Sequence, residues 1–389
     1  MPKQQGAGGA RCQPTQISAP GWFWALRVGK DDPAELSVTG LRRTGVISLA
    51  LLALVAVGLV GCASPQAPAG STSTTTPGVT AGISAGASAT PTISRPLGWS
   101  TPMAISPGII FFAISCPTMD FCAAVGIRTQ PAADVAVLYR AGSWSSPVAI
   151  DSASVVNAVS CATSNFCVAV DGSGRAMTFD GHSWSAPNRI SPVALASVSC
   201  PTSTFCGAVG TNVVSSPRVN DAVTFDGSGW SSPITLHPGD ATANVHAIAC
   251  PSSGFCVAVD TSGNALTYSA GSWSQPVAVA SHEILNSISC PSSTFCLTVG
   301  TGGTVATFNG ASWSGPMPAN NGQSLAWVSC ASSSFCVGVA ASGGSEVTYD
   351  GTNWSASKVI DQGNFFWVSC PSNNFCAAAD GGGSVFVLQ

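Results

Sequence analysis

The sequence predicts an all-β protein built from seven copies of one repeat, and three observations support this prediction. Cysteines fall in seven pairs with five residues between the two members, and a Phe always precedes the second Cys. A Trp recurs once in every repeat, and successive first cysteines lie 39 to 50 residues apart. Charged residues make up only 8% of the chain, so exposed helices with their usual Lys and Glu pairs are not expected.

Each repeat is expected to hold four short strands, as the second copy illustrates. Its strands are expected at 157–161, 166–170, 175–179 and 183–190. The pair Asp180-Gly181 separates the third strand from the fourth, and Asp-Gly favours hairpins because both central residues of the turn need positive φ. A period near 40 residues with only short strands inside it is typical of propeller blades. The predicted fold is therefore a seven-bladed β-propeller with four-stranded blades.

The two ends of the repeat region support a closed ring. The segment around Trp99 contains only the fourth strand of a repeat. The last repeat ends with its third strand, at 385–389. Together the two segments complete one blade, so an N-terminal strand would close the last blade and leave no open sheet edge. An open β-solenoid is the alternative, and it would not need a split blade.

The segment Phe-Asp-Gly-x-Ser-Trp at 179–184 resembles the turn motif of Asp-box and kelch-like propellers. The segment is about one residue shorter than an Asp box and lacks the double glycine of kelch repeats. The resemblance is therefore to the superfamily, over residues 97–389, and it implies the propeller architecture.

The cysteine pairs are predicted to form one local disulfide in every blade, because sevenfold repetition of one spacing makes pairing within each hairpin the simplest solution. Zinc binding is the alternative, but the chain has only four His and none recurs in the repeat. No metal or cofactor is expected. The predicted pairs are Cys116–Cys122, Cys161–Cys167, Cys200–Cys206, Cys250–Cys256, Cys290–Cys296, Cys330–Cys336 and Cys370–Cys376.

The N-terminal region has the order of a bacterial signal peptide. Arg42 and Arg43 precede an apolar run over 46–60, and the end of this run forms the motif Leu-Val-Gly-Cys at 59–62. This ending resembles the lipobox of bacterial lipoproteins, which implies cleavage before Cys62 and a lipid on its sulfur. Residues 1–61 are then expected to be removed, and an uncleaved membrane anchor is the alternative.

Residues 62–96 are predicted to form a tether. Beyond Cys62 the segment is almost entirely Ser, Thr, Pro, Gly and Ala, so it offers too little apolar surface to offset the entropy of ordering. The tether would hold the propeller, residues 97–389, away from the bilayer. The expected location is extracytoplasmic, on the outer face of the cytoplasmic membrane, with contact to the membrane through the lipid only.

Composition limits the classes of function. From residue 97 onward six basic residues stand against fourteen acidic ones with no basic stripe, which argues against a nucleic-acid partner. We expect a monomeric binding module for an envelope glycan or protein, without a catalytic residue. One alternative is a hydrolase or lyase acting on envelope polysaccharide through the acids that depart from the repeat, Asp221, Asp240, Glu283 and Glu346. The other alternative is a purely structural scaffold.

Candidate binding residues are those that depart from the repeat on one face of the disc. Antiparallel strands place the second-to-third-strand loops and the loops between repeats on the same face, which we term the variable face. Aromatic residues replace small ones just before the first strand of three adjacent repeats, which suggests an aromatic platform or, alternatively, filling of space at the closing blade. The candidates are Phe111, Phe112, Trp327, Phe366 and Trp367, together with the loop residues Arg128, Arg218 and His237.

Overall fold

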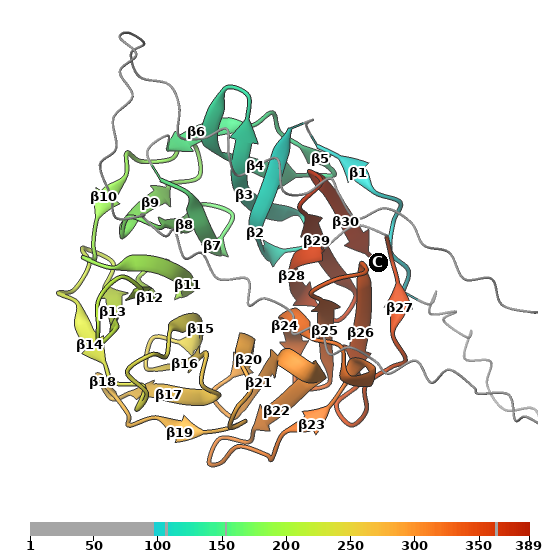
Figure 1. Cartoon of the computed structure of the whole chain (residues 1–389). Coiled ribbons are helices and arrows are strands. Elements are labelled where there is room, and N and C mark those ends of the chain that lie inside the picture. Colours follow the sequence, from blue (N-terminus) through green and yellow to red (C-terminus); the bar gives the residue numbers. More distant parts are fainter. Residues whose placement is uncertain (1–96, 106–107, 152–153, 362–364) are drawn as a thin grey trace, which may run out of the picture. The chain divides into compact units, whose positions relative to one another are not determined.

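A computed structural model describes residues 97–389 apart from 106–107, 152–153 and 362–364. The predicted leader, Cys62 and the predicted tether lie outside these residues. The described part forms seven antiparallel sheets arranged as a ring, which confirms the predicted seven-bladed propeller (Figure 1). Two short 3₁₀ turns, Thr301–Gly303 and Asn320–Gly322, are the helical elements among the described residues.

We number the blades 1 to 7 from Cys116 and name the strands a to d from the centre outward. Blade 1 holds β2 (Ile109–Thr118), β3 (Phe121–Thr129), β4 (Ala132–Arg140), β5 (Ser143–Trp144) and β6 (Val148–Asp151). Blade 2 holds β7 (Val156–Thr163), β8 (Phe166–Asp171), β9 (Arg175–Phe179) and β10 (Asn188–Arg189), and blade 3 holds β11 (Ala194–Thr202), β12 (Phe205–Asn212), β13 (Val219–Phe225) and β14 (Ile234–Leu236).

The remaining blades repeat this order. Blade 4 holds β15 (Val245–Ser252), β16 (Phe255–Asp260), β17 (Asn264–Ser269), β18 (Ser272–Trp273) and β19 (Val277–Ala278), and blade 5 holds β20 (Leu285–Ser292), β21 (Phe295–Gly300), β22 (Thr304–Phe308) and β23 (Met317–Pro318). Blade 6 holds β24 (Leu325–Ser332), β25 (Phe335–Ala340), β26 (Ser345–Tyr349) and β27 (Lys358–Val359). Blade 7 holds β28 (Phe365–Ser372), β29 (Phe375–Asp380), β30 (Ser384–Leu388) and β1 (Met103–Ala104).

The N-terminal strand closes the ring as predicted. β1 pairs antiparallel with β30, with Met103 opposite Val385, and Trp99 forms a further bridge to Leu388. A hydrogen bond of 2.9 Å from the Cys116 amide to the Ser369 hydroxyl also joins blades 1 and 7. Two segments that are far apart in sequence therefore share one sheet, so each a, b and c strand of the described ring has a partner.

Strand d differs from the continuous strand predicted at 183–190. Trp184 bridges to Phe179, the ladder then breaks, and pairing resumes only at β10. Pro stands three residues after the Trp in six of the seven repeats and lacks the amide that a ladder needs. A Ser after the Trp compensates, because its Oγ accepts a hydrogen bond of 2.9 to 3.1 Å from an amide of strand c in every blade.

The core lies between neighbouring blades. Aromatic rings of one blade stack on those of the next, with 6.4 Å between the centroids of Phe121 and Phe179 and 6.0 Å between those of Phe166 and Phe225. The strand b residues that follow the second Cys, such as Val168, Ala169 and Val170 of blade 2, are almost fully buried. Strand b is apolar on both sides because each sheet is covered by a blade on either face.

All seven predicted disulfides are present, each within one a–b hairpin. In blade 2 the two cysteines, Cys161 and Cys167, stand directly opposite each other in the ladder. The hairpin loop that each disulfide closes is short, so each should contribute roughly 2 kcal/mol of stability.

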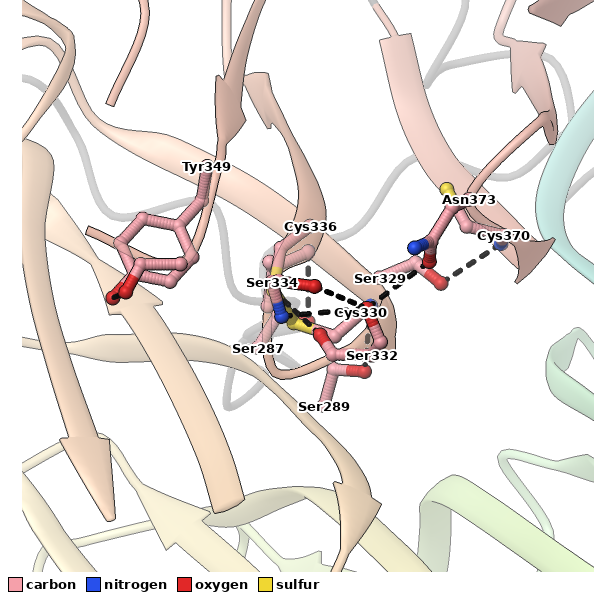
Figure 2. The surroundings of a disulfide bond; sticks show 12 residues. Ser287, Ser289, Ser329, Cys330, Ser332, Ser334, Cys336, Tyr349, Cys370 and Asn373 are labelled. Atoms are coloured by element: carbon pink, nitrogen blue, oxygen red, sulfur yellow. Dashed lines mark hydrogen bonds between the residues drawn. A yellow bond between two sulfur atoms is a disulfide. The ribbon is translucent and has the colours of Figure 1, made fainter. Parts of the chain in front are cut away.

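A second ring of bonds joins the blades beside the disulfides. The Ser before the first Cys of one blade accepts a hydrogen bond of 2.9 Å from the amide of the first Cys in the next blade. Figure 2 shows two of these bonds, from Cys330 to Ser289 and from Cys370 to Ser329. Six of the seven blade boundaries carry the bond. The boundary between blades 4 and 5 lacks it because Ala249 stands where the other blades have Ser.

Replacing Ala249 by Ser is expected to stabilise the protein by about 1 kcal/mol, the usual net contribution of one hydrogen bond. The new hydroxyl would accept from the Cys290 amide as the six existing Ser residues do at their boundaries. Chemical denaturation of the oxidised protein measures the change. Ser289→Ala is the matched control and should lower stability by a similar or larger amount, because it leaves the Cys330 amide without its partner. A lower stability of Ala249→Ser would contradict the prediction.

Candidate functional site

The a strands lie innermost in the ring (Figure 1). Residues of all seven line one central cavity, which we term the channel. Each blade lines the channel with three consecutive residues that end at the first Cys or one position before it, and the channel encloses about 210 Å³. This volume is below the usual range of pockets that enclose a small-molecule ligand, which begins at roughly 300 Å³. The channel is thus smaller than a typical ligand pocket, which favours a binding site at one of its ends.

Three aromatic rings gather at the end of the channel where the a strands begin. The centroids of Trp327 and Trp367 lie 6.1 Å apart with the rings tilted by 57°. Phe112 meets Trp367 edge to face, with centroids 6.0 Å apart and an interplanar angle of 83°. We term these three residues the aromatic cluster. They come from the adjacent blades 6, 7 and 1, and each is half-buried.

The repeat does not require tryptophan at the two Trp positions of the cluster. Trp327 and Trp367 each stand three residues before the first Cys, and both line the channel. The other five blades carry small residues there, namely Ala113, Ala158, Ser197, Ala247 and Ser287. Blades with a small residue at this position form the same four-stranded sheet, so the blade fold does not itself require Trp there.

The structure corrects the placement of the aromatic candidates. They lie inside strand a and not before it, at a bulge that shifts the register between Phe111 and Ala113 and between Phe365 and Trp367. Phe111 is fully buried, with 0% of its surface exposed, and belongs to the core between blades 1 and 7. It is therefore not available to a ligand. Phe366 lies in β28, and its side chain falls outside the described part of the protein.

The other candidates stand apart from the aromatic cluster. Arg128, at the end of β3, donates from Nε to the Pro131 carbonyl at 3.2 Å. Arg218 donates from Nη1 to the Thr242 carbonyl and to Asn244 Oδ1, which is 2.8 Å away. It thereby ties the β12–β13 loop of blade 3 to the loop that follows β14. His237 is exposed in that second loop.

Repeats 1 and 3 have extra residues between the second Cys and the Trp, and these two insertions of the variable face have different structures. The extra residues of blade 1 lengthen the hairpin, since β3 and β4 pair without interruption from Phe121 and Arg140 to Thr129 and Ala132. The sequence pattern had predicted a loop there. The extra residues of blade 3 form a true loop over 213–218, and Val214 at its tip is 86% exposed.

A cluster of carboxylates lies between blades 1 and 2 near the variable face. Arg175 forms ion pairs with Asp151 and with Asp171, the latter at 2.7 Å from Nε to Oδ2. Asp134 stands opposite Asp151 in the ladder, is 3% exposed, and has one carboxyl oxygen without a hydrogen-bond partner. The pKa of Asp134 is raised to about 7: burial has the largest effect and raises it, the Val156 amide lowers it, Asp151 and Asp171 raise it, and Arg175 lowers it. Sequence reasoning missed this cluster.

Three of the four acids considered for catalysis have hydrogen-bond partners close by. Asp221 is buried and accepts a hydrogen bond of 3.2 Å from the Thr235 hydroxyl. Asp240 accepts bonds of 2.8 Å from the Thr242 amide and the Ser262 hydroxyl, which lower its pKa. Glu283 accepts from the Thr301 hydroxyl. Each of these three carboxylates thus has a local partner.

Among the described residues, no group of three or more His, Cys, Asp or Glu side chains could hold a metal ion. In the same part of the chain no helix is long and apolar enough to cross a membrane.

Comparison with known proteins gives likenesses of structure only. No protein-family model and no curated protein sequence matches the chain. Solved structures do match, and in each case the similarity is one of fold. YCF48 bound to D1 peptide has a TM-score of 0.57 at 16% identity and covers 75% of this chain and 96% of its own. YCF48 from Cyanidioschyzon merolae has a TM-score of 0.55 at 15% identity, and the match covers 75% of this chain and 98% of that structure. U3-55K has a TM-score of 0.60 at 9% identity, and the match covers 74% of this chain and 98% of that structure.

Proposed function

We propose that this propeller is a binding module that recognises a segment of a partner protein at the aromatic cluster. The observation that carries the proposal is the replacement of Ala or Ser by Trp327 and Trp367 in adjacent blades, where Phe112 extends the same aromatic surface. Tryptophan is enriched among the few residues that carry most of the binding free energy at protein interfaces, because its side chain offers a large rigid surface at low entropic cost. The half-burial of the three rings leaves part of that surface to a ligand.

A protein segment is favoured over other ligands by two considerations. The channel is too small for a bulky ligand, so the partner has to lie across its end, as an extended chain can. One propeller of similar fold, YCF48, has been solved with a bound D1 peptide, which supports a peptide ligand by analogy. Tryptophan also stacks on sugar rings, so an envelope glycan is the second candidate, and the same variants test it.

We further propose that the module works at the cell envelope. The lipobox-like ending at Cys62 and the Ser- and Thr-rich segment 62–96 support anchoring by a lipid to the outer face of the cytoplasmic membrane. Seven disulfides agree with folding in an oxidising compartment. In this proposal the protein is a monomer that binds without catalysing a reaction. Hydrolysis or cleavage of envelope polysaccharide and a purely structural role remain the alternatives.

The test compares the protein with a Trp327→Ser and Trp367→Ala double variant in pull-downs from the envelope fraction, followed by cross-linking mass spectrometry. The double variant carries residues that other blades have at this position, so it is expected to fold. We expect it to bind an envelope partner at least about tenfold more weakly, the loss of roughly 1.4 kcal/mol or more that truncation of an interface Trp produces. Val214→Ser, on the same face, is the control that should leave binding intact.

Two outcomes would reject the peptide proposal. Retention of the same envelope proteins by the double variant would remove the aromatic cluster from the interface. Binding of the protein to an array of envelope glycans, lost in the double variant, would replace the peptide by a sugar. Depolymerisation of any of those glycans during the assay would favour the enzyme alternative.

A further inference from the structure

Two asparagines stand at the end of the channel that holds the aromatic cluster, which we term the mouth. Asn157 of blade 2 and Asn286 of blade 5 each lie four residues before the first Cys, the position that Phe112 of the aromatic cluster has in blade 1. Each is the unpaired residue of a bulge in strand a, because the register shifts across it. A bulge re-aims a side chain relative to the ladder. The seven residues at this position are Phe112, Asn157, Ala196, His246, Asn286, Ala326 and Phe366.

The two Asn side chains are anchored in the same way. Asn157 donates from Nδ2 to the Leu195 carbonyl at 2.7 Å, and Asn286 donates from Nδ2 to the Leu325 carbonyl at 2.8 Å. Each bond crosses to the next blade, where the acceptor lies five residues before the first Cys. Because a carbonyl can accept only from the NH₂ group, the bond also fixes which way each amide points. A side chain held in this way loses little entropy when a ligand binds it.

Each anchored amide keeps one acceptor and one donor for a ligand. Within the described part of the chain, neither Oδ1 accepts a hydrogen bond, and the bond to the next blade uses only one of the two Nδ2 hydrogens. Both residues are half-buried, and their Oδ1 atoms are accessible, because the buried polar atoms that lack a partner belong to other residues. A peptide group also presents one donor and one acceptor, so each Asn can pair with one peptide group of a bound chain.

The two amides flank the aromatic cluster. Blades 5, 6, 7, 1 and 2 are consecutive in the ring. At the mouth they present, in this order, Asn286, Trp327, Trp367, Phe112 and Asn157. Counted the other way, blades 2 and 5 are three steps apart in a ring of seven, so the two amides stand on nearly opposite sides of the mouth. A chain that runs straight from one Asn to the other therefore crosses the mouth with the three rings along one side of it.

The blade fold does not require Asn at this position, because blades 3 and 6 carry Ala196 and Ala326 there and form the same four-stranded sheet. A peptide that covers an aromatic surface does require such groups. Its own N–H and C=O groups leave water on binding, and each one that finds no partner weakens the complex. The aromatic cluster offers apolar surface and no acceptor, whereas the two amides offer an acceptor on either side of it.

Resting on the binding function proposed above, we propose that Asn157 and Asn286 hold the main chain of the bound segment. Each Oδ1 accepts from an N–H of the segment, and each Nδ2 donates to a C=O. The segment crosses the mouth in an extended form, and an apolar side chain between the two held peptide groups lies on Trp327 and Trp367. Main-chain bonds give affinity without reading sequence, so the site selects its partner by that apolar side chain.

Peptides selected from a phage-displayed library of random linear sequences against the whole oxidised protein test the proposal. One selected peptide is synthesised, and its binding is measured by fluorescence anisotropy. We expect Asn157→Ala and Asn286→Ala each to weaken binding about five- to tenfold, the effect of losing about one hydrogen bond, and the double variant to weaken it by about the product of the two factors. Asn373→Ala, just after β28 at the other end of strand a, is the control that should leave binding unchanged.

N-methylation of the peptide separates main-chain from side-chain recognition. The methyl group replaces the amide hydrogen, so methylation at each of the two held positions should weaken binding to the unsubstituted protein about five- to tenfold. At one position this loss should disappear in Asn157→Ala and at the other in Asn286→Ala, because the partner of that amide is already gone.

Failure of this inference differs from failure of the proposed function. Selection of no peptide, or of peptides that bind equally to the Trp327→Ser and Trp367→Ala double variant, would reject both. Peptides that need the two Trp residues but bind unchanged to both Asn variants would overturn the role of Asn157 and Asn286 alone. The same would follow if no N-methylation weakened binding to the unsubstituted protein, or if every such loss persisted in both Asn variants.

Discussion

Replacing Phe111 by Ala is expected to destabilise the protein by about 3–5 kcal/mol, the usual cost of deleting a buried aromatic ring. Phe111 is fully buried in the core cluster between blades 1 and 7, which also contains Ala379 and Val385 of the closing blade. Five other blades place a fully buried Val or Leu at the same position, at Val156, Leu195, Val245, Leu285 and Leu325. A cavity at this position in blade 1 would weaken the boundary on which closure of the ring depends.

Phe112→Ala is the matched comparison for that change. The two residues are neighbours in sequence, but the bulge in β2 sends Phe112 to the aromatic cluster, where it contacts Trp367 edge to face. We expect a loss of about 1 kcal/mol or less for Phe112→Ala, together with weaker binding of a partner. Guanidinium denaturation of the oxidised protein measures the loss of stability in each of the two variants. Equal destabilisation by the two changes would contradict the assignment of Phe111 to the core and Phe112 to the binding surface.

The repeat pattern predicted the parts of the fold that depend on spacing. The cysteine pairs predicted the disulfides, because a disulfide across a hairpin requires a fixed number of residues between the two Cys. The cysteine pairs and Trp positions together predicted the number of blades and the split blade, because each blade repeats them at a regular interval. The break in strand d was not predicted, although its cause is visible in the sequence. Ser100 and Pro102, like their counterparts in five other repeats, supply a side-chain acceptor and remove an amide within three residues.

The candidate site was predicted only in part. Trp327 and Trp367 could be found because they depart from a small residue at a fixed distance before the first Cys. Phe111 was misassigned because strand a of blade 1 begins earlier than the pattern indicated, at Ile109, so Phe111 lies inside the strand at a position that other blades fill with a buried Val or Leu. Residues brought together between blades left no signal, since Asp134 and Asp171 are 37 positions apart and neither spacing nor composition links them.

The carboxylate cluster makes stability depend on pH in an unusual direction. The pKa of Asp134 is about 7 in the folded protein and 3.8 as an unperturbed group. At a pH between these two values, folding therefore takes up a proton. Because the folded state binds more protons there, the free energy of unfolding should fall as pH rises from about 4 to 7. Burial also raises the pKa of Asp171, Asp221 and Asp380, which acts in the same direction.

Asp134→Asn is therefore expected to stabilise the protein at pH 8 and to flatten its stability between pH 4 and 7. Each pKa unit corresponds to about 1.4 kcal/mol, and after allowance for screening by Arg175 and water we expect a gain of about 2 kcal/mol at pH 8. The amide keeps an acceptor for the Val156 amide and offers its NH₂ group to Asp151 or Asp171. Denaturant midpoints at pH 5 and pH 8 measure the effect.

Asp180→Asn is the matched control for the pH experiment. Asp180 lies in an exposed c–d turn, where it accepts bonds of 2.8 Å from the amides of His182 and Ser183, and these bonds lower its pKa. Asn309 makes the same turn in blade 5, so the substitution should be tolerated and should leave the pH profile above 4 unchanged. A profile for Asp134→Asn as steep as that of the unsubstituted protein would assign the pH dependence to the other buried acids, because Asp134 would then be no source of proton uptake on folding.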